Sequence, residues 1–153
     1  MPDQIVISDT SSLIALTNIG ELEVLKKVYG TVTLSPEIAE EYGLELPEWI
    51  KVVPVKDQQK LQLLNLELDK GESSGIALAL ENPNSLLILD ERKGREIAKK
   101  LGLKIVGILG VLVKAKELGV IEFLKPLLIK LEAADFRMSE KLKAMVLERV
   151  GEV

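Results

Sequence analysis

Four acidic residues stand at positions from which a fold could bring their carboxylates together: Asp9, Glu41, Glu72 and Asp90. Asp9 follows the largely apolar run 5–8, and Asp90 follows the apolar run 86–89. Short runs of this kind, rich in Ile, Val and Leu, are typical of strands buried on both faces. Ligands of an open parallel sheet bind beyond the carboxyl ends of its strands. If the two strands are neighbours, Asp9 and Asp90 lie side by side at one edge of the sheet.

Helices are expected to carry the other two acids. Glu41 belongs to a helix that begins after Ser35 and lies close to the inward side of that helix, whereas Glu40 faces solvent. Glu72 falls in the first turn of a helix expected to begin at Gly71, which puts it near the inner face. The fold could therefore add both carboxylates to the pair at the sheet edge.

Carboxylates that converge repel one another, and each raises the pKa of its neighbours unless a cation neutralises the cluster. A site rich in oxygen and free of histidine suits Mg²⁺ or Mn²⁺, which engage phosphate as a further ligand. Such an ion can activate water for attack on phosphorus and neutralise the charge on the leaving oxygen. The four acids therefore predict phosphodiester hydrolysis.

The composition of the 153 residues narrows the chemistry further. The chain has neither Cys nor His, which excludes disulfides, structural zinc, cysteine nucleophiles, serine triads and histidine acid/base catalysis. The net charge of −4 does not attract an anionic polymer, so a nucleic-acid role needs a local basic patch or a bridging metal. Carboxylates, hydroxyls, Lys, Arg or a bound ion must carry any reaction.

Length and hydropathy predict one soluble domain over residues 1–153. Apolar residues make up 47% of the chain, enough for a substantial core built mainly from Leu, Ile, Val and Ala. No apolar run reaches the ~18 to 20 residues of a membrane span, and residues 1–4 lack the basic start of a secretory signal. We expect a cytoplasmic protein with no membrane contact.

Strand and helix patterns alternate along the chain. Strands are expected near residues 5–8, 31–34, 50–55, 86–89 and 104–106, with helices between them, the first capped by Ser11 or Ser12. Two further helices follow, over residues 123–131 and 142–150. This alternation predicts an α/β fold in three layers, α/β/α, with a central parallel sheet of four to five strands covered on both faces. The helices from about residue 120 either pack on the domain or form an interface.

Four segments together resemble the PIN-domain nucleases, especially the branch close to the VapC toxins of toxin-antitoxin systems. They are VISDTSSLI around Asp9, SPEIAEEY around Glu41, GESSGIALA around Glu72 and LLILDER around Asp90. The resemblance covers nearly the whole chain. Any one segment is weak evidence, but four in the same order and spacing are fairly specific.

The resemblance implies a metal-dependent ribonuclease with a PIN-like fold. Asp9, Glu41, Glu72 and Asp90 would be its catalytic acids and would bind one or two Mg²⁺ or Mn²⁺ ions. Asp9 and Asp90 would be direct ligands, while Glu72 and Glu41 complete the shell or orient the attacking water. Hydroxyls at Thr10, Ser11 and Ser12 would support the site or contact the substrate. Similar proteins cleave RNA to leave a 5′-phosphate and a 3′-hydroxyl, and many are toxins restrained by a small antitoxin protein.

The chain departs from the family pattern at Ile108, where relatives often have Thr or Ser. This change removes a polar group near the site. Glu91, directly after Asp90, offers a substitute acid. The number of metal ions stays open for this reason.

The densest basic stretch follows the last of the four acids: Arg92, Lys93, Arg95, Lys99, Lys100 and Lys104. Arg92 and Arg95 lie at the start of a helix beside Asp90, and an arginine binds phosphate in a forked geometry. They are the candidates for substrate contact, whereas Lys99 and Lys100 are typical of a solvated helix face. With only 3% aromatic residues, an aromatic platform for stacking bases is not expected.

Two Leu- and Ile-rich regions, residues 13–25 and 118–131, are more apolar than a solvated helix needs. They are either core or a surface for a partner. Relatives commonly form homodimers, which favours the second use without locating the face. RNA, a second copy of the chain and a small antitoxin are therefore the expected partners.

Three other functions share some features with this sequence. A phosphatase of the haloacid dehalogenase type also has an Asp after the first strand, but it needs a second Asp two residues later, where Ser11 stands. A response-regulator receiver expects paired acids at the first strand and a Lys after the last, whereas Asp3 is too early and Lys104 begins its strand. A non-catalytic PIN-fold module that binds metal or RNA stays open, although the four acids favour an enzyme.

Overall fold

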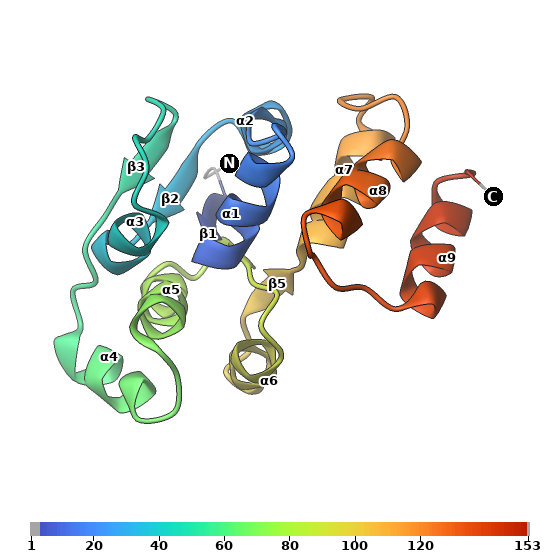
Figure 1. Ribbon diagram of the computed structural model, residues 1–153. Coiled ribbons are helices and arrows are strands. Elements are labelled where there is room, and N and C mark those ends of the chain that lie inside the picture. The colour runs from blue at the N-terminus through green and yellow to red at the C-terminus, as the bar shows by residue number, and fades with distance from the viewer. Residues whose placement is uncertain (1–3, 153) are drawn as a thin grey trace.

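Five short strands form one parallel sheet in the computed structural model, which describes residues 4–152 (Figure 1). The strands are β1 (Ile5–Ser8), β2 (Val32–Leu34), β3 (Ile50–Val52), β4 (Ser85–Ile88) and β5 (Lys104–Val106), in the spatial order β3-β2-β1-β4-β5. The central strands β1 and β4 pair in parallel from Ile5 with Ser85 to Ser8 with Ile88. This register brings the segments after both strands to one edge of the sheet.

Helices cover both faces of the sheet, which confirms the predicted three-layer α/β/α fold. Against one face lie α1 (Thr10–Asn18), α2 (Glu23–Tyr29), α7 (Ile108–Glu117) and α8 (Lys125–Ala133). Against the other lie α4 (Gln58–Asn65), α5 (Lys70–Glu81) and α6 (Arg92–Lys100). Helix α3 (Pro36–Tyr42) contacts both α1 and α5, and α9 (Glu140–Arg149) follows α8.

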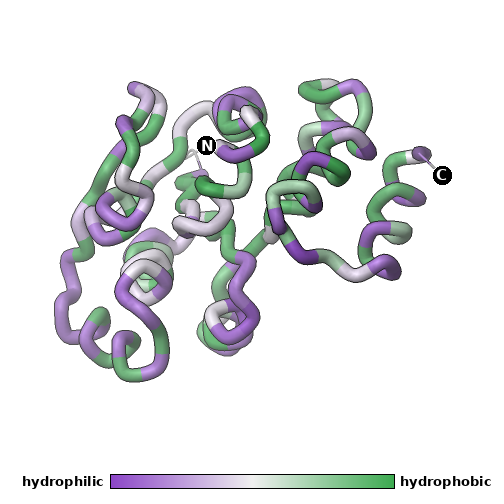
Figure 2. Tube along the Cα trace, in the orientation of Figure 1, coloured by the Kyte–Doolittle hydropathy of each residue, from purple (hydrophilic) through white to green (hydrophobic). Residues whose placement is uncertain are grey.

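Alternation along the strands divides the core into two apolar clusters. Val6 and Ile88 pack with the first set of helices, whereas Ile7 and Leu87 pack with the second. Figure 2 shows hydropathy along the same trace, where hydrophobic and hydrophilic stretches alternate within most helices. Because neighbouring side chains of a strand point to opposite faces, both helix layers are anchored by the same strands.

The two Leu-rich regions contribute mainly to the core. Leu13, Leu16 and Leu25 are fully buried, and so are Leu124, Leu128 and Leu131. Exposed apolar side chains occur beside the second group, at Leu118, Phe123 and Ile129. Some residues of these regions therefore belong to the core, and others are exposed and open to a partner.

Two helix starts differ from the prediction. Helix α1 is capped by Asp9, whose carboxylate accepts a hydrogen bond from the Ser12 amide, and neither Ser11 nor Ser12 is the cap. Helix α5 begins at Lys70 with Asp69 as its cap, one residue before the expected start at Gly71. Both differences have the same physical reason. An Asp caps a helix as well as a Ser does, and in each case an Asp stands directly before the first helical residue.

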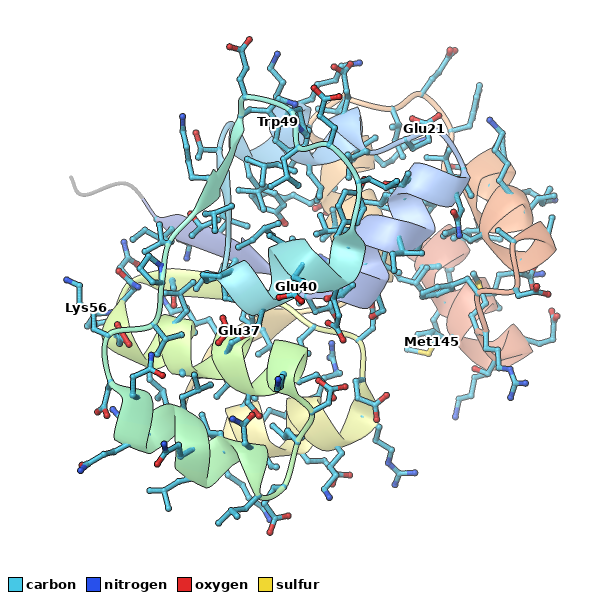
Figure 3. All side chains as sticks on the ribbon, turned by 60° about the vertical axis from the view of Figure 1, so that its left-hand side comes forward. Glu21, Glu37, Glu40, Trp49, Lys56 and Met145 are labelled. Atoms are coloured by element: carbon cyan, nitrogen blue, oxygen red, sulfur yellow. The ribbon has the colours of Figure 1, made fainter. Side chains whose placement is uncertain are left out.

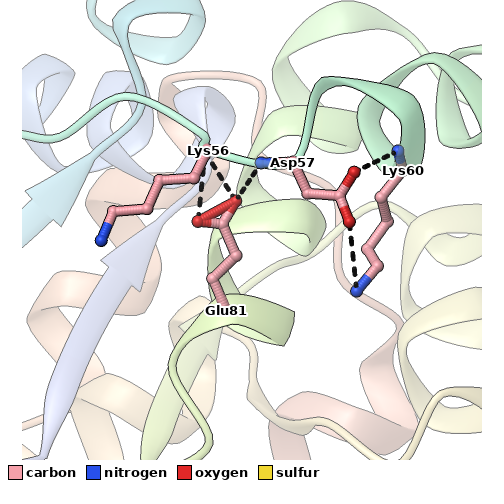
Figure 4. Close-up of polar contacts among 4 residues, drawn as sticks. All are labelled: Lys56, Asp57, Lys60 and Glu81. Carbon is pink, nitrogen blue, oxygen red and sulfur yellow. Dashed lines mark hydrogen bonds and ion pairs between the residues drawn. The ribbon is translucent and has the colours of Figure 1, made fainter.

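A clip of hydrogen bonds fixes the connection from the edge strand β3 to α4 (Figure 4). Both oxygens of Glu81 accept from the Lys56 amide, at 2.7 and 3.1 Å, and Oε1 also accepts from the Asp57 amide at 3.1 Å. Asp57 in turn caps α4 through the amide of Lys60. Because Glu81 ends α5, the clip ties the path of α4 to the helix that carries Glu72.

Residues 1–3 and 153 lie outside the described part of the chain, so the predictions about the first residues, Asp3 included, concern undescribed positions. None of the helices over residues 4–152 has the length and apolar character that crossing a bilayer requires. The strand order also differs from that of the receiver fold, in which the first strand lies between the second and the third.

Candidate functional site

A cleft of about 240 Å³ opens at the carboxyl edge of the sheet. Five acids line it: Asp9, Glu41, Asp69, Glu72 and Glu91. Thr10, Ser11 and Ile14 complete the lining, which contains no Lys or Arg. The fold thus gathers three of the four predicted acids in one cleft, and Asp90 lies directly beside it.

Asp9 is the most buried of these acids, with only 4% of its surface exposed. Its Oδ1 accepts from the Ser12 amide at 2.9 Å, and its Oδ2 accepts from the Asp90 amide at 3.1 Å. The strand pairing explains the second bond, because the Asp9 amide also donates to the carbonyl of Ile88 at 2.9 Å. Asp9 and Asp90 are therefore adjacent, as the sequence predicts.

Three consecutive hydroxyls each donate a hydrogen bond to a different acid. Thr10 donates to Glu41. Ser11 donates to Asp9 at 3.1 Å, and Ser12 donates to Asp90 at 2.9 Å. One helical turn of α1 thus orients carboxylates from β1, α3 and the end of β4.

The carboxylate of Asp90 is held from the opposite side by helix α7. The Ile108 amide, in the first turn of that helix, donates to both carboxylate oxygens at 3.2 Å. Burial and the nearby charge of Asp9 raise the pKa of Asp90, while the bonds from Ile108 and Ser12 and the charge of Arg95 oppose the rise. The side chain of Ile108 is fully buried, so the backbone supplies the polar contact at this position.

Glu72 is the least satisfied acid of the cleft. Its Oε2 is buried without a hydrogen-bond partner among the described residues. Burial, followed by the charges and hydrogen bonding of neighbouring acids, raises its pKa to about 8. A buried oxygen that lacks a donor is costly, and a cation would relieve that cost.

Three glycines leave room for three of the carboxylates. A Cβ added at Gly71 would collide with Oε1 of Glu41. A Cβ at Gly94 would come within 2.9 Å of Oε2 of Glu72, and one at Gly107 within 2.7 Å of Oδ1 of Asp90. These positions explain why helices α5 and α6 tolerate glycine near their starts, at some cost in helix propensity.

Comparison with known families identifies the fold that carries this site. The sequence pattern of a family described as a PIN domain matches residues 5–152. The chain belongs to the PIN-domain family. No curated protein matches it. PIN domains are a nuclease-type fold that generally uses divalent metal ions and often cleaves RNA, so the family and the chemistry of the cleft agree.

The donor set of this PIN domain fits a hard divalent cation. All of the cleft's charged groups are carboxylates, and one buried carboxylate oxygen lacks a donor. Over residues 4–152 no three Asp or Glu side chains already converge closely enough to hold an ion together. Hydrogen bonds to Thr10, Ser11 and Ser12 keep them spaced around the cleft, as mutual repulsion favours.

The structure separates the two arginines that the sequence treats alike. Arg92 is 92% exposed at its side chain and pairs with Glu96 on its own helix at 3.3 Å, so it does not turn toward the cleft. Arg95 donates from Nη1 to the Leu89 carbonyl at 2.8 Å and lies near Asp90. Only Arg95 is positioned beside a site acid.

Asp69 lines the cleft but was not predicted from the sequence as a site residue. Asp69 caps α5 by accepting from the Glu72 amide at 2.9 Å, and its charge raises the pKa of Glu72. Its signal was an Asp immediately before a helix start, which is a capping pattern. Glu91, proposed as a substitute acid, does line the cleft, while Glu40 is exposed on α3 (Figure 3).

Proposed function

We propose that this PIN domain is an endoribonuclease that hydrolyses RNA phosphodiesters with Mg²⁺ or Mn²⁺. The observation that supports this most is the buried, unpartnered Oε2 of Glu72 in a cleft whose charged groups are all carboxylates. Such a cleft repels RNA by itself, and a bound cation changes it into a site that attracts a phosphate. Membership of the PIN-domain family, a nuclease-type fold, supports the same function.

Asp9, Glu72 and Asp90 would hold the cation, with Glu41 and Glu91 at the rim. When bound, a divalent cation supplies an activated water for attack on phosphorus and neutralises charge on the leaving oxygen. Water adds across the bond between phosphorus and the 3′ oxygen, which leaves a 5′-phosphate and a 3′-hydroxyl. Ser12 and the Ile108 amide keep the Asp90 carboxylate in place during this step.

Cleavage of a mixed single-stranded RNA pool tests the proposal. Wild type should cleave the pool with Mn²⁺ and fail to do so with EDTA. The double variant Asp9→Asn, Asp90→Asn should fold and remain inactive with Mn²⁺. Wild type that binds Mn²⁺ but leaves every RNA intact would instead favour a non-catalytic binding module, and cleavage that survives EDTA would overturn the metal-dependent mechanism.

We further propose that the protein is a toxin of the VapC-like branch, restrained by a small antitoxin protein and active as a homodimer in the cytoplasm. The exposed apolar side chains of Leu118, Phe123 and Ile129 are available to a partner. Induced expression of wild type should arrest cell growth, and Asp9→Asn should not. Equal growth of the two cultures would argue for an RNA-processing role, and light scattering would measure the oligomeric state.

A further inference from the structure

A second hollow lies on the other side of Asp90, between β5, α7 and the C-terminal segment that leads into α9. It measures about 620 Å³, within the roughly 300–1,000 Å³ of ordinary ligand sites. Apolar side chains form most of its wall, among them Ile105, Leu109 and Leu142. We call this hollow the C-terminal groove. Asp90 lines the groove, while the next residue, Glu91, and the hydrogen-bonded Asp9 line the acidic cleft, so the two hollows are neighbours.

The charge of the C-terminal groove is opposite to that of the cleft. Two arginines, Arg95 and Arg137, line it. Neither forms an ion pair within residues 4–152. Arg95 gives one hydrogen bond from Nη1 to the Leu89 carbonyl, and its remaining N–H groups can bind an anion together with Arg137. Gly107, in the wall of the groove, lies close to both Asp90 and Arg95, because a Cβ there would come within 2.7 Å of Oδ1 of Asp90 and 3.1 Å of Nη1 of Arg95. An anion bound to Arg95 would therefore lie next to the candidate catalytic acids.

The end of α8 fixes an aromatic side chain in the same groove. Asp135 has a left-handed backbone, with φ of 68°, and the Phe136 amide donates to the Leu131 carbonyl at 2.9 Å. This helix-ending turn sets the direction of the chain where Phe136 and Arg137 line the groove. An aromatic face beside a guanidinium group matches the two parts of a nucleotide, a flat base and a charged phosphate.

We propose that the C-terminal groove holds the RNA nucleotide next to the phosphate that is cleaved. Its base packs against Phe136 and the apolar wall, and its phosphate faces Arg95 and Arg137. The proposal rests on the proposed ribonuclease function and adds where the substrate lies. The two arginines complement a phosphate, and the adjacent residues Asp90 and Glu91 line the groove and the cleft, which favours RNA over a peptide as the occupant. A single aromatic residue suits one base, which agrees with the lack of an aromatic platform.

Two groove variants and two matched controls test this placement. The groove variants are Phe136→Leu, which keeps an apolar side chain, and Arg137→Gln. The controls are Leu66→Ala, an exposed apolar residue at the end of α4, and Lys141→Gln, an exposed cation on α9. All four proteins are titrated in EDTA with a short single-stranded RNA that carries a fluorescent base, and cleavage kinetics are then measured with Mn²⁺.

Each groove variant should raise both the Kd for the RNA and the KM about tenfold, the size of one stacking or charged contact. Its kcat should stay within about twofold, because the cleft is unchanged, and both controls should behave as wild type. Groove variants with the Kd and KM of the controls would overturn the proposal while wild-type cleavage left the nuclease function intact. A wild type that neither binds nor cleaves RNA would overturn both.

Discussion

The acidic cleft and the neighbouring C-terminal groove are lined by side chains of opposite character. The cleft is lined by five carboxylates and hydroxyls, and its helices come from the first two thirds of the chain. The C-terminal groove is apolar and carries two arginines, one of them from the segment before α9. One hollow is suited to a cation, and the other is suited to a nucleotide. Under the proposed function, a negatively charged chain would bind RNA through the groove and cleave it at the adjacent cleft.

The two regions also differ in how firmly they are fixed. The acids of the cleft are anchored by strand pairing, by helix α1 and by close contacts at three glycines. In contrast, helix α9 has no buried residue: its Val146 and Leu147 pack partly buried against the core, and Lys143 pairs with Glu132 at 2.8 Å. A substitution among the acids of the cleft should therefore disturb more fixed contacts than one on the α9 side of the groove.

The largest effect is expected on the cleft side, from Asp9→Asn. Asn caps a helix as well as Asp does, so α1 should keep its start. Its amide nitrogen cannot accept from the Asp90 amide as Oδ2 of Asp9 does, so the melting temperature should fall by a few degrees while the protein stays folded in the assay. Cleavage of RNA should fall about a thousandfold or more, because a cation loses its most buried charged ligand. Single-turnover kinetics and circular dichroism would measure the two quantities. Wild-type cleavage by this variant would remove the cleft from the mechanism.

Gly107→Ala changes the wall of the groove beside Asp90 and Arg95. The new Cβ would lie 2.7 Å from Oδ1 of Asp90 and 3.1 Å from Nη1 of Arg95, so both side chains must move. A displacement of this kind should lower kcat/KM about a hundredfold. Gly75→Ala is the matched control, since its Cβ meets Ile38 at 3.4 Å, an ordinary contact. Equal activity of the two variants would show that Gly107 does not position the site.

Ser12→Ala and Ser11→Ala compare a buried hydroxyl of α1 with an exposed one. Ser12 is fully buried and donates to Asp90, whereas Ser11 is exposed. Losing the buried hydrogen bond should lower the free energy of unfolding by about 1–2 kcal/mol. Ser11→Ala should stay within about 0.5 kcal/mol of wild type. Urea denaturation compares them, and equal losses would contradict the assigned role of Ser12.

The smallest effect is a pH dependence that belongs to the cleft alone. The pKa of Glu72 rises from 4.5 to about 8 on folding, so between these values the folded protein binds more protons than the unfolded chain. Stability from this group is complete below pH 4.5 and is lost as the pH rises through about 8. Glu72→Gln should therefore melt higher than wild type at pH 8 in EDTA and lose this advantage toward pH 4.

Melting curves across this pH range would measure the effect, with the exposed Glu40→Gln as the control. A control variant with the same pH profile as Glu72→Gln would show that burial in the cleft is not the cause. Addition of Mn²⁺ should stabilise wild type more than Glu72→Gln at pH 8, because a cation favours the ionised carboxylate.

Most of the fold could be predicted because its signals are local. The runs ending at Asp9 and Asp90 each combine β-branched or Leu-rich strands with an acid at the carboxyl end, and parallel pairing does the rest. The adjacency of these two acids follows from the same pattern. The start of α1 was wrong by a few residues because Asp9 serves both as a site acid and as a helix cap.

The details of the site depend on contacts between distant segments, which the sequence does not display. Asp69 resembles an ordinary cap until α5 packs beside β1, and Gly94 resembles a weak helix residue until Glu72 lies against it. Arg92 and Arg95 differ only by their rotation around α6. Phe136 and Arg137 reach the groove through a turn at Asp135, which has a positive φ, a conformation uncommon for residues other than glycine.

The measurement that tests the account most directly is a calorimetric titration of wild type and Asp9→Asn with Mn²⁺ near neutral pH. We expect saturable binding to wild type and an affinity at least about tenfold weaker for the variant, because a buried carboxylate ligand is lost. Equal affinity of the two proteins would show that the cation, if it binds, binds elsewhere. That result would contradict the assignment of the acidic cleft as the metal site of this PIN domain.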